Sequence, residues 1–179
     1  NEYRRLGLPN EENLIGNGIH FCVSCDGAFY KDKVVAVIGG GNTAIVTSEA
    51  LSQLCKKVYL VQNLEFLTAE KVLIDRINKR SNVEIIYNSV VKKLNGEDEL
   101  ESIIISNGKE EKELKIDGMF ISIGLVPQND FLKDLINLSE NKFIISDNDC
   151  HTNIEGIFVA GDCRDKKVRQ ITTATNDGT

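Results

Sequence analysis

Short runs of apolar and β-branched residues recur along the chain, and each is followed by glycine or polar residues. Runs of this length and composition are typical of strands that are buried on both faces of a sheet. They are residues 34–38, 58–61, 83–87 and 119–123. Between them we expect helices over 42–54 and 69–79, the second from apolar residues at helical spacing. Strands that alternate with helices predict an α/β fold with a Rossmann-like βαβ unit.

The pattern changes between residues 89 and 116. Leu100–Ser106 has the composition of a strand, and the pair Asn107–Gly108 that follows is a strong signal for a hairpin turn. Lys112–Ile116 then alternates polar with apolar residues, as a half-buried strand does. We therefore expect an antiparallel β insertion in the α/β domain.

A boundary is expected at residues 125–129, a segment that contains one of only two prolines. Beyond it we expect a helix over 130–136, strands over 142–146 and 156–160, and a helix that begins near Arg169. The chain ends at Thr179, soon after that helix begins, and residue 1 is asparagine rather than methionine. Both features lead us to expect a piece of a longer protein.

Composition and charge narrow the class of protein. Of 179 residues, 41% are hydrophobic and 27% are charged, which is ordinary for a globular protein, and the net charge is −6. An acidic chain presents no uniformly basic face, so nucleic acid is not an expected partner. No apolar run approaches the roughly 20 residues of a membrane span, so no membrane association is expected, and no secretory signal opens the chain. Five cysteines, an odd number, favour a reducing cytoplasmic setting over a secreted disulfide scaffold.

The first motif with chemical meaning is Gly39-x-Gly41-x-x-Ala44, directly after a strand and at the start of a helix. Glycines at this spacing let the backbone approach a pyrophosphate, and the helix N-terminus offers N–H groups to it. A tight turn without a ligand is the alternative. The next strand ends at Val61, where a carboxylate would select NAD and an arginine would select NADP. Residues 62–68 contain no arginine, and their only carboxylate, Glu65, lies three residues past Gln62.

The second motif is Cys22-Val23-Ser24-Cys25, followed by Asp26. Two thiols at this spacing are typical of a redox centre, because disulfide exchange needs one attacking and one resolving thiol. Asp26 is a candidate general acid and base for the thiol protons, or a cap. Two alternatives stay open at this point: a pair of unreactive thiols, and half of a zinc site. Residues that could complete a zinc site are Cys150, His151 and His20.

The third motif is the apolar run 156–160 followed by Gly161-Asp162. A buried strand that ends in this way places a carboxylate at the carboxyl edge of a sheet, where open α/β sheets bind ligands. The alternative is a strand followed by an ordinary turn.

Taken in order, these motifs resemble one family, the low-molecular-weight, bacterial-type thioredoxin reductases. The segments that carry the resemblance are 3–9, GNGIHFCVSCDG at 16–27, VAVIGGGNTA at 35–44, 69–71, ISIGLVP at 121–127 and GIFVAGDCRDKKVRQ at 156–170. The resemblance implies two Rossmann-like domains, an FAD domain interrupted by a nucleotide domain. Residues 3–127 then correspond to the NAD(P)H-binding-like domain with the CxxC redox pair. Residues 128–179 correspond to an incomplete C-terminal portion of the FAD domain.

The resemblance also implies roles for individual residues and a thioredoxin partner. FAD passes electrons to a Cys22–Cys25 disulfide, in which Cys25 faces the flavin, Cys22 attacks the disulfide of thioredoxin and Asp26 exchanges protons. No metal is implied. Residues assigned to FAD are Gly161, Asp162, Arg169, Gln170 and Ile171. Residues assigned to the NADPH pyrophosphate turn are Gly39, Gly41, Asn42, Thr43 and Ala44.

One departure from the family concerns the electron donor. The His-Arg-Arg-x-x-x-Arg sequence that holds the 2′-phosphate of NADPH falls here on Gln62, Asn63, Leu64 and Thr68, and a family acidic pair falls on Val46-Thr47. Without arginines the charge-assisted hydrogen bonds that select a phosphate are lost. The chain is similar in this respect to variant reductases whose flavin receives electrons from reduced ferredoxin.

The resemblance further implies a homodimeric parent enzyme. From the chain alone we expect neither bound flavin nor reductase turnover. Two other functions are compatible with the motifs: a non-catalytic binding or regulatory module with a nucleotide fold, and another flavoprotein disulfide reductase.

Overall fold

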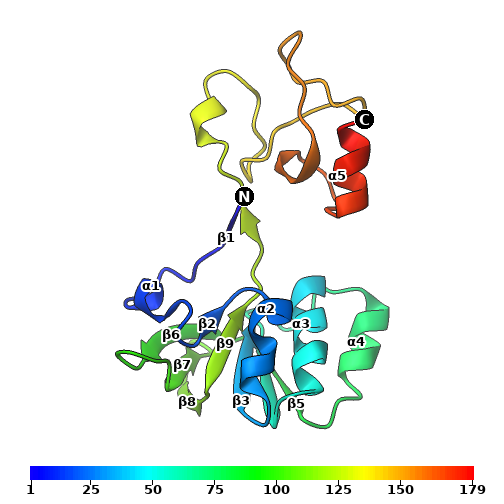
Figure 1. Cartoon of the computed structure of the whole chain (residues 1–179). Coiled ribbons are helices and arrows are strands. Elements are labelled where there is room, and N and C mark those ends of the chain that lie inside the picture. The colour runs from blue at the N-terminus through cyan, green and yellow to red at the C-terminus, as the bar shows by residue number, and fades with distance from the viewer. The chain divides into compact units, whose positions relative to one another are not determined.

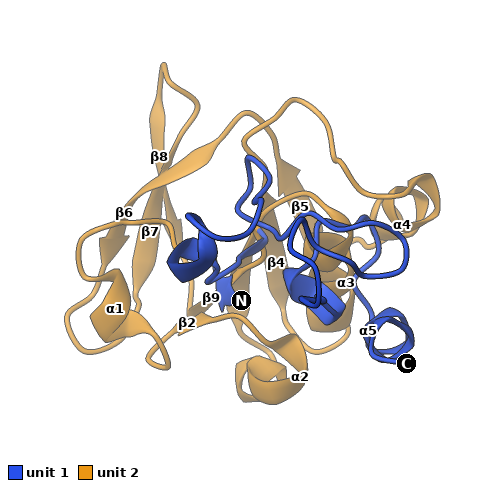
Figure 2. Cartoon of the chain, turned by 90° about the horizontal axis from the view of Figure 1, so that it is seen from above, with its two compact units in different colours: residues 1–4, 124–179 blue, residues 5–123 orange.

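The computed structural model describes all residues, 1–179, and divides them into two compact units. Unit 2 is Arg5–Ile123, and unit 1 consists of Asn1–Arg4 together with Gly124–Thr179 (Figure 2). The chain thus passes between the units after residues 4 and 123, and the second crossing lies directly before the boundary expected at 125–129.

Unit 2 is built on a five-stranded parallel sheet in the order β2-β9-β3-β4-β5 (Figure 1). Buried apolar runs form its long strands, as expected for a sheet that is covered on both faces. The strands are β2 (Ile19–His20), β3 (Val34–Ile38), β4 (Lys57–Val61), β5 (Val83–Ile86) and β9 (Gly118–Ile121).

Alternate residues of β3 face the two sides of this sheet. Val35 and Val37 pack in one apolar cluster with residues of helices α3 (Asn42–Ser52) and α4 (Lys71–Ile77). Ala36 and Ile38 pack in another cluster, which contains residues of the antiparallel insertion. This two-residue period is the expected geometry of a strand, and it places the helices on one face and the insertion on the other.

The insertion is a three-stranded antiparallel sheet in the order β6-β7-β8. Its strands are β6 (Val90–Asn95), β7 (Ser102–Ser106) and β8 (Glu111–Lys115). The expected α/β fold with an antiparallel insertion is therefore confirmed, but β6 was not expected. Its register shifts between Val91 and Lys93, so the buried residues Val91 and Leu94 lie three positions apart instead of two or four. The irregularity hides the alternation by which a strand is recognised.

Three short helices complete unit 2. The segment before β2 forms α1 (Glu11–Leu14), and the CxxC segment forms α2 (Val23–Asp26), which continues into the 3-10 turn η1 (Gly27–Tyr30). No helix of the protein combines the length and the apolar character needed to cross a membrane.

Glu49 is a buried carboxylate that ties α3 to α4. Its two oxygens contact Arg76 at 2.6 and 3.1 Å, and Arg80 donates to Oε1 at 3.1 Å. The hydrogen bond from Arg76 is the largest cause that lowers the pKa of Glu49, and Arg80 adds to it against the opposing effect of burial. A carboxylate whose pKa is lowered on folding contributes stability above its unfolded pKa of about 4.3 and loses it as the pH falls through its folded pKa.

We expect Glu49→Gln to lower the free energy of unfolding at neutral pH by about 1–3 kcal/mol, since hydrogen bonds to charged groups are lost. We also expect the deficit to shrink when the pH falls below about 4.3, because the unfolded parent chain is then protonated at Glu49, whereas the folded chain stays ionised until the pH reaches its lowered pKa. Urea unfolding at pH 7 and pH 3.5 measures both effects. Lys71→Gln removes the exposed Lys71–Asp75 pair on α4, the helix that carries Arg76, and is the control. A deficit that is equal at both pH values contradicts the prediction.

Unit 1 contains little regular structure. β1 (Glu2–Tyr3) pairs antiparallel with β10 (Leu125–Val126), and one longer helix, α5 (Ile171–Asp177), ends the unit. Its small apolar core consists of Ile136, Ile144 and Val159. α5 is the helix that the sequence predicted to begin near Arg169. At its start the Gln170 N–H donates to Thr173 Oγ1 at 3.1 Å.

Three elements expected in unit 1 are wrong. The helix expected over 130–136 is reduced to the 3-10 turn η2 (Asp130–Leu132). The strands expected over 142–146 and 156–160 form only isolated bridges, which join Ile144 to Leu138 and Arg164 and join Phe158 to His151. An apolar run becomes a strand only where a neighbour continues a ladder of hydrogen bonds. The segments beside these two runs are too short for that: residues 137–139 and 163–165 bond to 143–145, and residues 150–152 bond to 157–159.

Candidate functional site

Cys22 and Cys25 form a disulfide, with their Cα atoms 5.3 Å apart. Cys22 follows β2 and caps α2, where its Sγ accepts a hydrogen bond of 3.2 Å from the Cys25 backbone N–H. Cys22 is half-buried and Cys25 is exposed. An N–H directed at a sulfur stabilises its thiolate form, so the local structure favours Cys22 as an attacking thiol.

The other cysteines do not join this pair. Cys55 is buried, and burial is the main cause that raises the pKa of its thiol to about 11. No group of three or more His, Cys, Asp or Glu side chains anywhere in residues 1–179 has an arrangement that could hold a metal ion. The structure therefore offers no support for the zinc alternative.

Asp26 lies at the end of α2, directly after Cys25, and its backbone N–H donates to the Cys22 carbonyl at 3.1 Å. Its Oδ2 is 3.2 Å from Nδ1 of His20, and Nε2 of His20 is 2.7 Å from Oη of Tyr30. Sequence reasoning did not connect these residues. The available signal was that His20 precedes Cys22 by two positions at the end of a strand.

Tyr30 is a buried phenol in an acidic environment. Burial raises the pKa of Tyr30 to about 12, and the negative charges of Asp26, Glu99 and Asp117 add to the effect. The phenol therefore keeps its proton at neutral pH and can donate it in a hydrogen bond to His20.

The glycine turn closes β3 onto α3 as expected for a dinucleotide fold. Gly39 has a φ of +131°, and a Cβ there would lie 2.4 Å from the Ser122 carbonyl oxygen. Gly41 precedes α3 with ordinary extended backbone, and a Cβ there would meet only Thr68 Oγ1 at 3.7 Å. Gly39 is thus needed by the fold, whereas Gly41 leaves open space at the start of the helix.

We expect these two glycines to respond differently to alanine. Gly39→Ala combines an unfavourable backbone conformation with a clash and is expected to cost roughly 2–4 kcal/mol of stability. Gly41→Ala is expected to cost less than about 1 kcal/mol, the usual range for a cap position. Thermal or urea unfolding of both variants measures this. Equal destabilisation by the two substitutions is the outcome that refutes the assignment.

The other residues assigned to the pyrophosphate turn differ in how far they are exposed to solvent. Ala44 is buried, while Asn42 and Thr43 are exposed. The Asn42 side chain accepts from the Glu70 N–H at 2.8 Å and donates to the Glu70 carboxylate at 3.2 Å, which links the starts of α3 and α4. Asn42 is therefore held in place by Glu70 rather than free.

Gln62 occupies the position where the family places histidine, and it lies against the glycine turn. It is 4% exposed, its Nε2 donates to the Phe66 carbonyl, and its Oε1 accepts from the Asn63 N–H. A Cβ on Gly40 would lie within 2.4–2.9 Å of its amide group. The three arginine positions of the family fall on side chains that are exposed and uncharged: Asn63, Leu64 and Thr68.

The Gly161-Asp162 motif forms the 3-10 turn η3 (Gly161–Cys163) in unit 1. Gly161 has a φ of +82°, and its N–H donates to Asp177 at 2.9 Å. Oδ1 of Asp162 is buried and has no hydrogen-bond partner in the protein. A buried carboxylate oxygen without a donor fits a ligand that carries hydroxyl groups, as the ribityl and ribose parts of FAD do.

The other residues assigned to FAD are less enclosed. The Arg169 guanidinium lies 4.0 Å above the centre of the Phe143 ring and also donates to the Asp162 carbonyl at 3.4 Å. Gln170 is exposed, and Ile171 is 84% exposed. The structure therefore brings Arg169 next to Asp162, and it leaves the next two residues on the surface.

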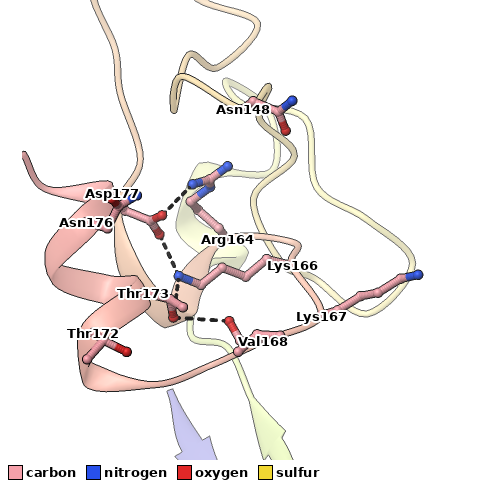
Figure 3. Close-up of a pocket in the computed structure, with 9 residues that line it drawn as sticks. All are labelled: Asn148, Arg164, Lys166, Lys167, Val168, Thr172, Thr173, Asn176 and Asp177. Carbon is pink, nitrogen blue, oxygen red and sulfur yellow. Dashed lines mark hydrogen bonds and ion pairs between the residues drawn. The ribbon is translucent and has the colours of Figure 1, made fainter.

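A charged pocket lies beside this turn (Figure 3). Asp177 accepts from Arg164 at 2.8 Å and from Lys166 at 2.6 Å, and the hydrogen bond from Lys166 is the main cause that lowers the pKa of Asp177. The residues that line the pocket are Asn148, Arg164, Lys166, Lys167, Val168, Thr172, Thr173, Asn176 and Asp177. Sequence reasoning did not predict this network of ion pairs around Asp177. The only signal for it was the basic residues at 164, 166 and 167.

Comparison with known proteins gives the family. The model of the pyridine nucleotide-disulphide oxidoreductase family matches residues 2–178, and the chain therefore belongs to this family. Within it, the chain is similar to bacterial thioredoxin reductases. The thioredoxin reductase of Mycoplasma genitalium is 42% identical over 180 residues, and a Clostridium pasteurianum protein described as a 34.2 kDa protein in a rubredoxin operon is 42% identical over 178 residues.

Solved structures agree with these relatives. Thioredoxin reductase from Lactococcus lactis matches with a TM-score of 0.90 at 36% identity, over 99% of this chain and 59% of that one. A ferredoxin-flavin thioredoxin reductase from Clostridium acetobutylicum matches with a TM-score of 0.55 at 25% identity, over 99% of this chain and 56% of that one. The alignment with the Mycoplasma genitalium reductase covers 99% of this chain and 57% of that protein. The alignment with the Clostridium pasteurianum protein covers 98% of this chain and 58% of that protein. The chain thus spans less than two thirds of their length.

Proposed function

We propose that this chain is part of a flavin-dependent thioredoxin reductase and carries the disulfide that reduces thioredoxin. The single observation that carries the proposal is the Cys22–Cys25 disulfide at the start of α2, with Asp26 directly after it. The similarity to thioredoxin reductases across nearly the whole chain supports it. The test is thioredoxin reduction by the complete reductase in which either cysteine is replaced by serine.

The proposed chemistry at the cysteines is thiol–disulfide exchange. In the reduced pair, the Cys22 thiolate attacks one sulfur of the thioredoxin disulfide, which forms a mixed disulfide and releases the other thioredoxin sulfur as a thiolate. Cys25 then attacks Cys22, which restores the Cys22–Cys25 bond and releases reduced thioredoxin. Asp26 accepts the proton that Cys25 loses, and the released thiolates take up protons.

We propose that residues 3–127, which include the whole of unit 2, form the NAD(P)H-binding-like domain and that residues 128–179 belong to an FAD-binding domain. FAD, when bound, supplies the two electrons that reopen the disulfide. Asp162 would hold a hydroxyl group of this cofactor through Oδ1, which lacks a partner in the protein. Arg169 would lie at the same site, since it already contacts the Asp162 carbonyl.

We propose reduced ferredoxin rather than NADPH as the electron donor. Support comes from the uncharged side chains of Asn63, Leu64 and Thr68, which offer no cation to a 2′-phosphate. The similarity to a structure described as a ferredoxin-flavin thioredoxin reductase is in accord with this choice. We further propose a cytoplasmic setting and a homodimeric complete enzyme, on the odd cysteine count and the family resemblance.

A further inference from the structure

His20 connects the interior of unit 2 with the disulfide segment through hydrogen bonds. It ends β2 and is 8% exposed. One ring nitrogen, Nε2, lies 2.7 Å from Oη of Tyr30, and the other, Nδ1, lies 3.2 Å from Oδ2 of Asp26. Tyr30, His20 and Asp26 thus form a continuous line that ends next to Cys25.

Packing fixes the imidazole in this position. Its ring centre lies 5.4 Å from that of Phe120 and 5.3 Å from that of Tyr30, and the two aromatic rings contact each other edge to face at 5.6 Å. Asp26 on α2 is the charged group that pairs with His20 itself. Around the Tyr30 end lie two carboxylates, Glu99 and Asp117, and the ammonium of Lys33, which is 5.3 Å from the ring centre.

The line of side chains accommodates two protonation states of His20. When the imidazole is neutral, the Tyr30 hydroxyl donates to Nε2, and Nδ1–H donates to Asp26. When the imidazole is protonated, both ring N–H groups donate, one to Oη of Tyr30 and the other to the Asp26 carboxylate. In neither state does a buried ring nitrogen lose its partner, so a proton can enter and leave at little cost.

We propose that His20 is a positioning residue that holds, and passes to Asp26, the proton taken up when the Cys22–Cys25 disulfide is reduced. A thiolate of the reductant attacks one sulfur, the S–S bond breaks, and its electron pair leaves on the other sulfur as a thiolate. Nδ1–H of His20 gives its proton to the Asp26 carboxylate, which delivers it to that thiolate. A second thiolate of the reductant then releases the first cysteine, and the reductant ends as a disulfide. Histidine suits this task because it exchanges its proton near neutral pH, where carboxyl groups are ionised.

The inference rests on the proposed function for its role in turnover, but its test needs neither flavin nor thioredoxin. The chain has only two histidines, so its imidazole proton resonances are few. We would follow these resonances by NMR as the pH is varied, in the oxidised chain and in the reduced chain. Reduction uses dithiothreitol, and the reagent is then removed under anaerobic conditions. His151→Gln assigns the two signals. His151 pairs with Asp147 at the same N–O distance of 3.2 Å within unit 1 and is the internal control.

We expect the midpoint of His20 to rise by about 0.5 pH unit or more on reduction, which is roughly a threefold gain in proton affinity, because the proton that the reduced pair takes up is shared through Asp26 with the imidazole. The midpoint of His151 is expected to stay the same. Equal midpoints of His20 in the two redox states overturn the proposal. This measurement uses the unaltered chain, so it is decisive even if substitution of His20 prevents folding.

Kinetics provide a second test with a readout that a merely structural role does not move. His20→Gln keeps a donor for Asp26 but cannot titrate. We expect the parent chain to be reduced by dithiothreitol at least about threefold faster than this variant at pH 6, with the ratio falling toward one at pH 8.5. A ratio that is independent of pH contradicts the proposal. If His20 passes both tests but the complete enzyme fails to reduce thioredoxin, only the proposed function is wrong.

Discussion

Replacing either Cys22 or Cys25 with serine in the complete reductase is expected to lower the rate of thioredoxin reduction by a factor on the order of 10³ or more, the scale typical of removing a residue that forms a covalent intermediate. Without Cys22 no thiolate attacks thioredoxin. Without Cys25 the mixed disulfide forms but is not resolved. A serine hydroxyl replaces neither thiol, because it forms no disulfide.

The control for this prediction is Cys55→Ala. Cys55 is buried, and its thiol stays protonated because its pKa is raised to about 11. The substitution is expected to leave turnover within about twofold of the parent, since an inert buried thiol takes no part in exchange. Turnover at the parent rate in Cys22→Ser or Cys25→Ser sinks the assignment of this pair as the redox centre.

The second large effect concerns NADPH. Each charge-assisted hydrogen bond to a phosphate contributes about 1.5–3 kcal/mol, so the lack of three arginines is expected to weaken NADPH binding by a factor of roughly 10³ or more. In anaerobic stopped-flow experiments on the complete reductase, micromolar NADPH is therefore expected to reduce the flavin at least about 100-fold more slowly than reduced ferredoxin does.

A gain-of-function variant gives this prediction a matched comparison. Asn63→Arg, Leu64→Arg and Thr68→Arg together place cations at three exposed positions after β4. We expect the triple variant to bind NADPH more tightly than the parent but to gain little affinity for NADH, which has no 2′-phosphate. Rapid and complete flavin reduction of the parent by micromolar NADPH contradicts the account of the donor.

The sequence was informative where local patterns decide the structure. Continuous apolar runs such as Val34–Ile38 predicted the parallel strands, and the glycines before Asn42 predicted the turn into α3. The Cys22–Cys25 spacing predicted a close pair of thiols. Each of these features depends on residues a few positions apart, which periodicity and spacing describe directly.

Features that depend on distant partners could not be predicted. The apolar run at 156–160 is not a strand, because residues 150–152 meet it at an isolated bridge instead of along a continued ladder. The contacts of His20 with Tyr30 and Asp26 join a strand, a 3-10 turn and a helix, and Gln62 meets the glycine turn only through the parallel pairing of β3 and β4. Spacing along the chain places His20 near Cys22 but does not show which side chains such a residue contacts.

The central claim is that Cys22 is the thiol that attacks thioredoxin. The most direct measurement is a trapping experiment, in which the chain with Cys25→Ser reacts with a thioredoxin that keeps only its exposed active-site cysteine, activated as an aromatic mixed disulfide. Peptide mapping by mass spectrometry then locates the bond. The account predicts a stable link to Cys22 in high yield and several-fold less product from the Cys22→Ser chain. Equal yields from the two variants, or a link mainly to Cys55, Cys150 or Cys163, would contradict it.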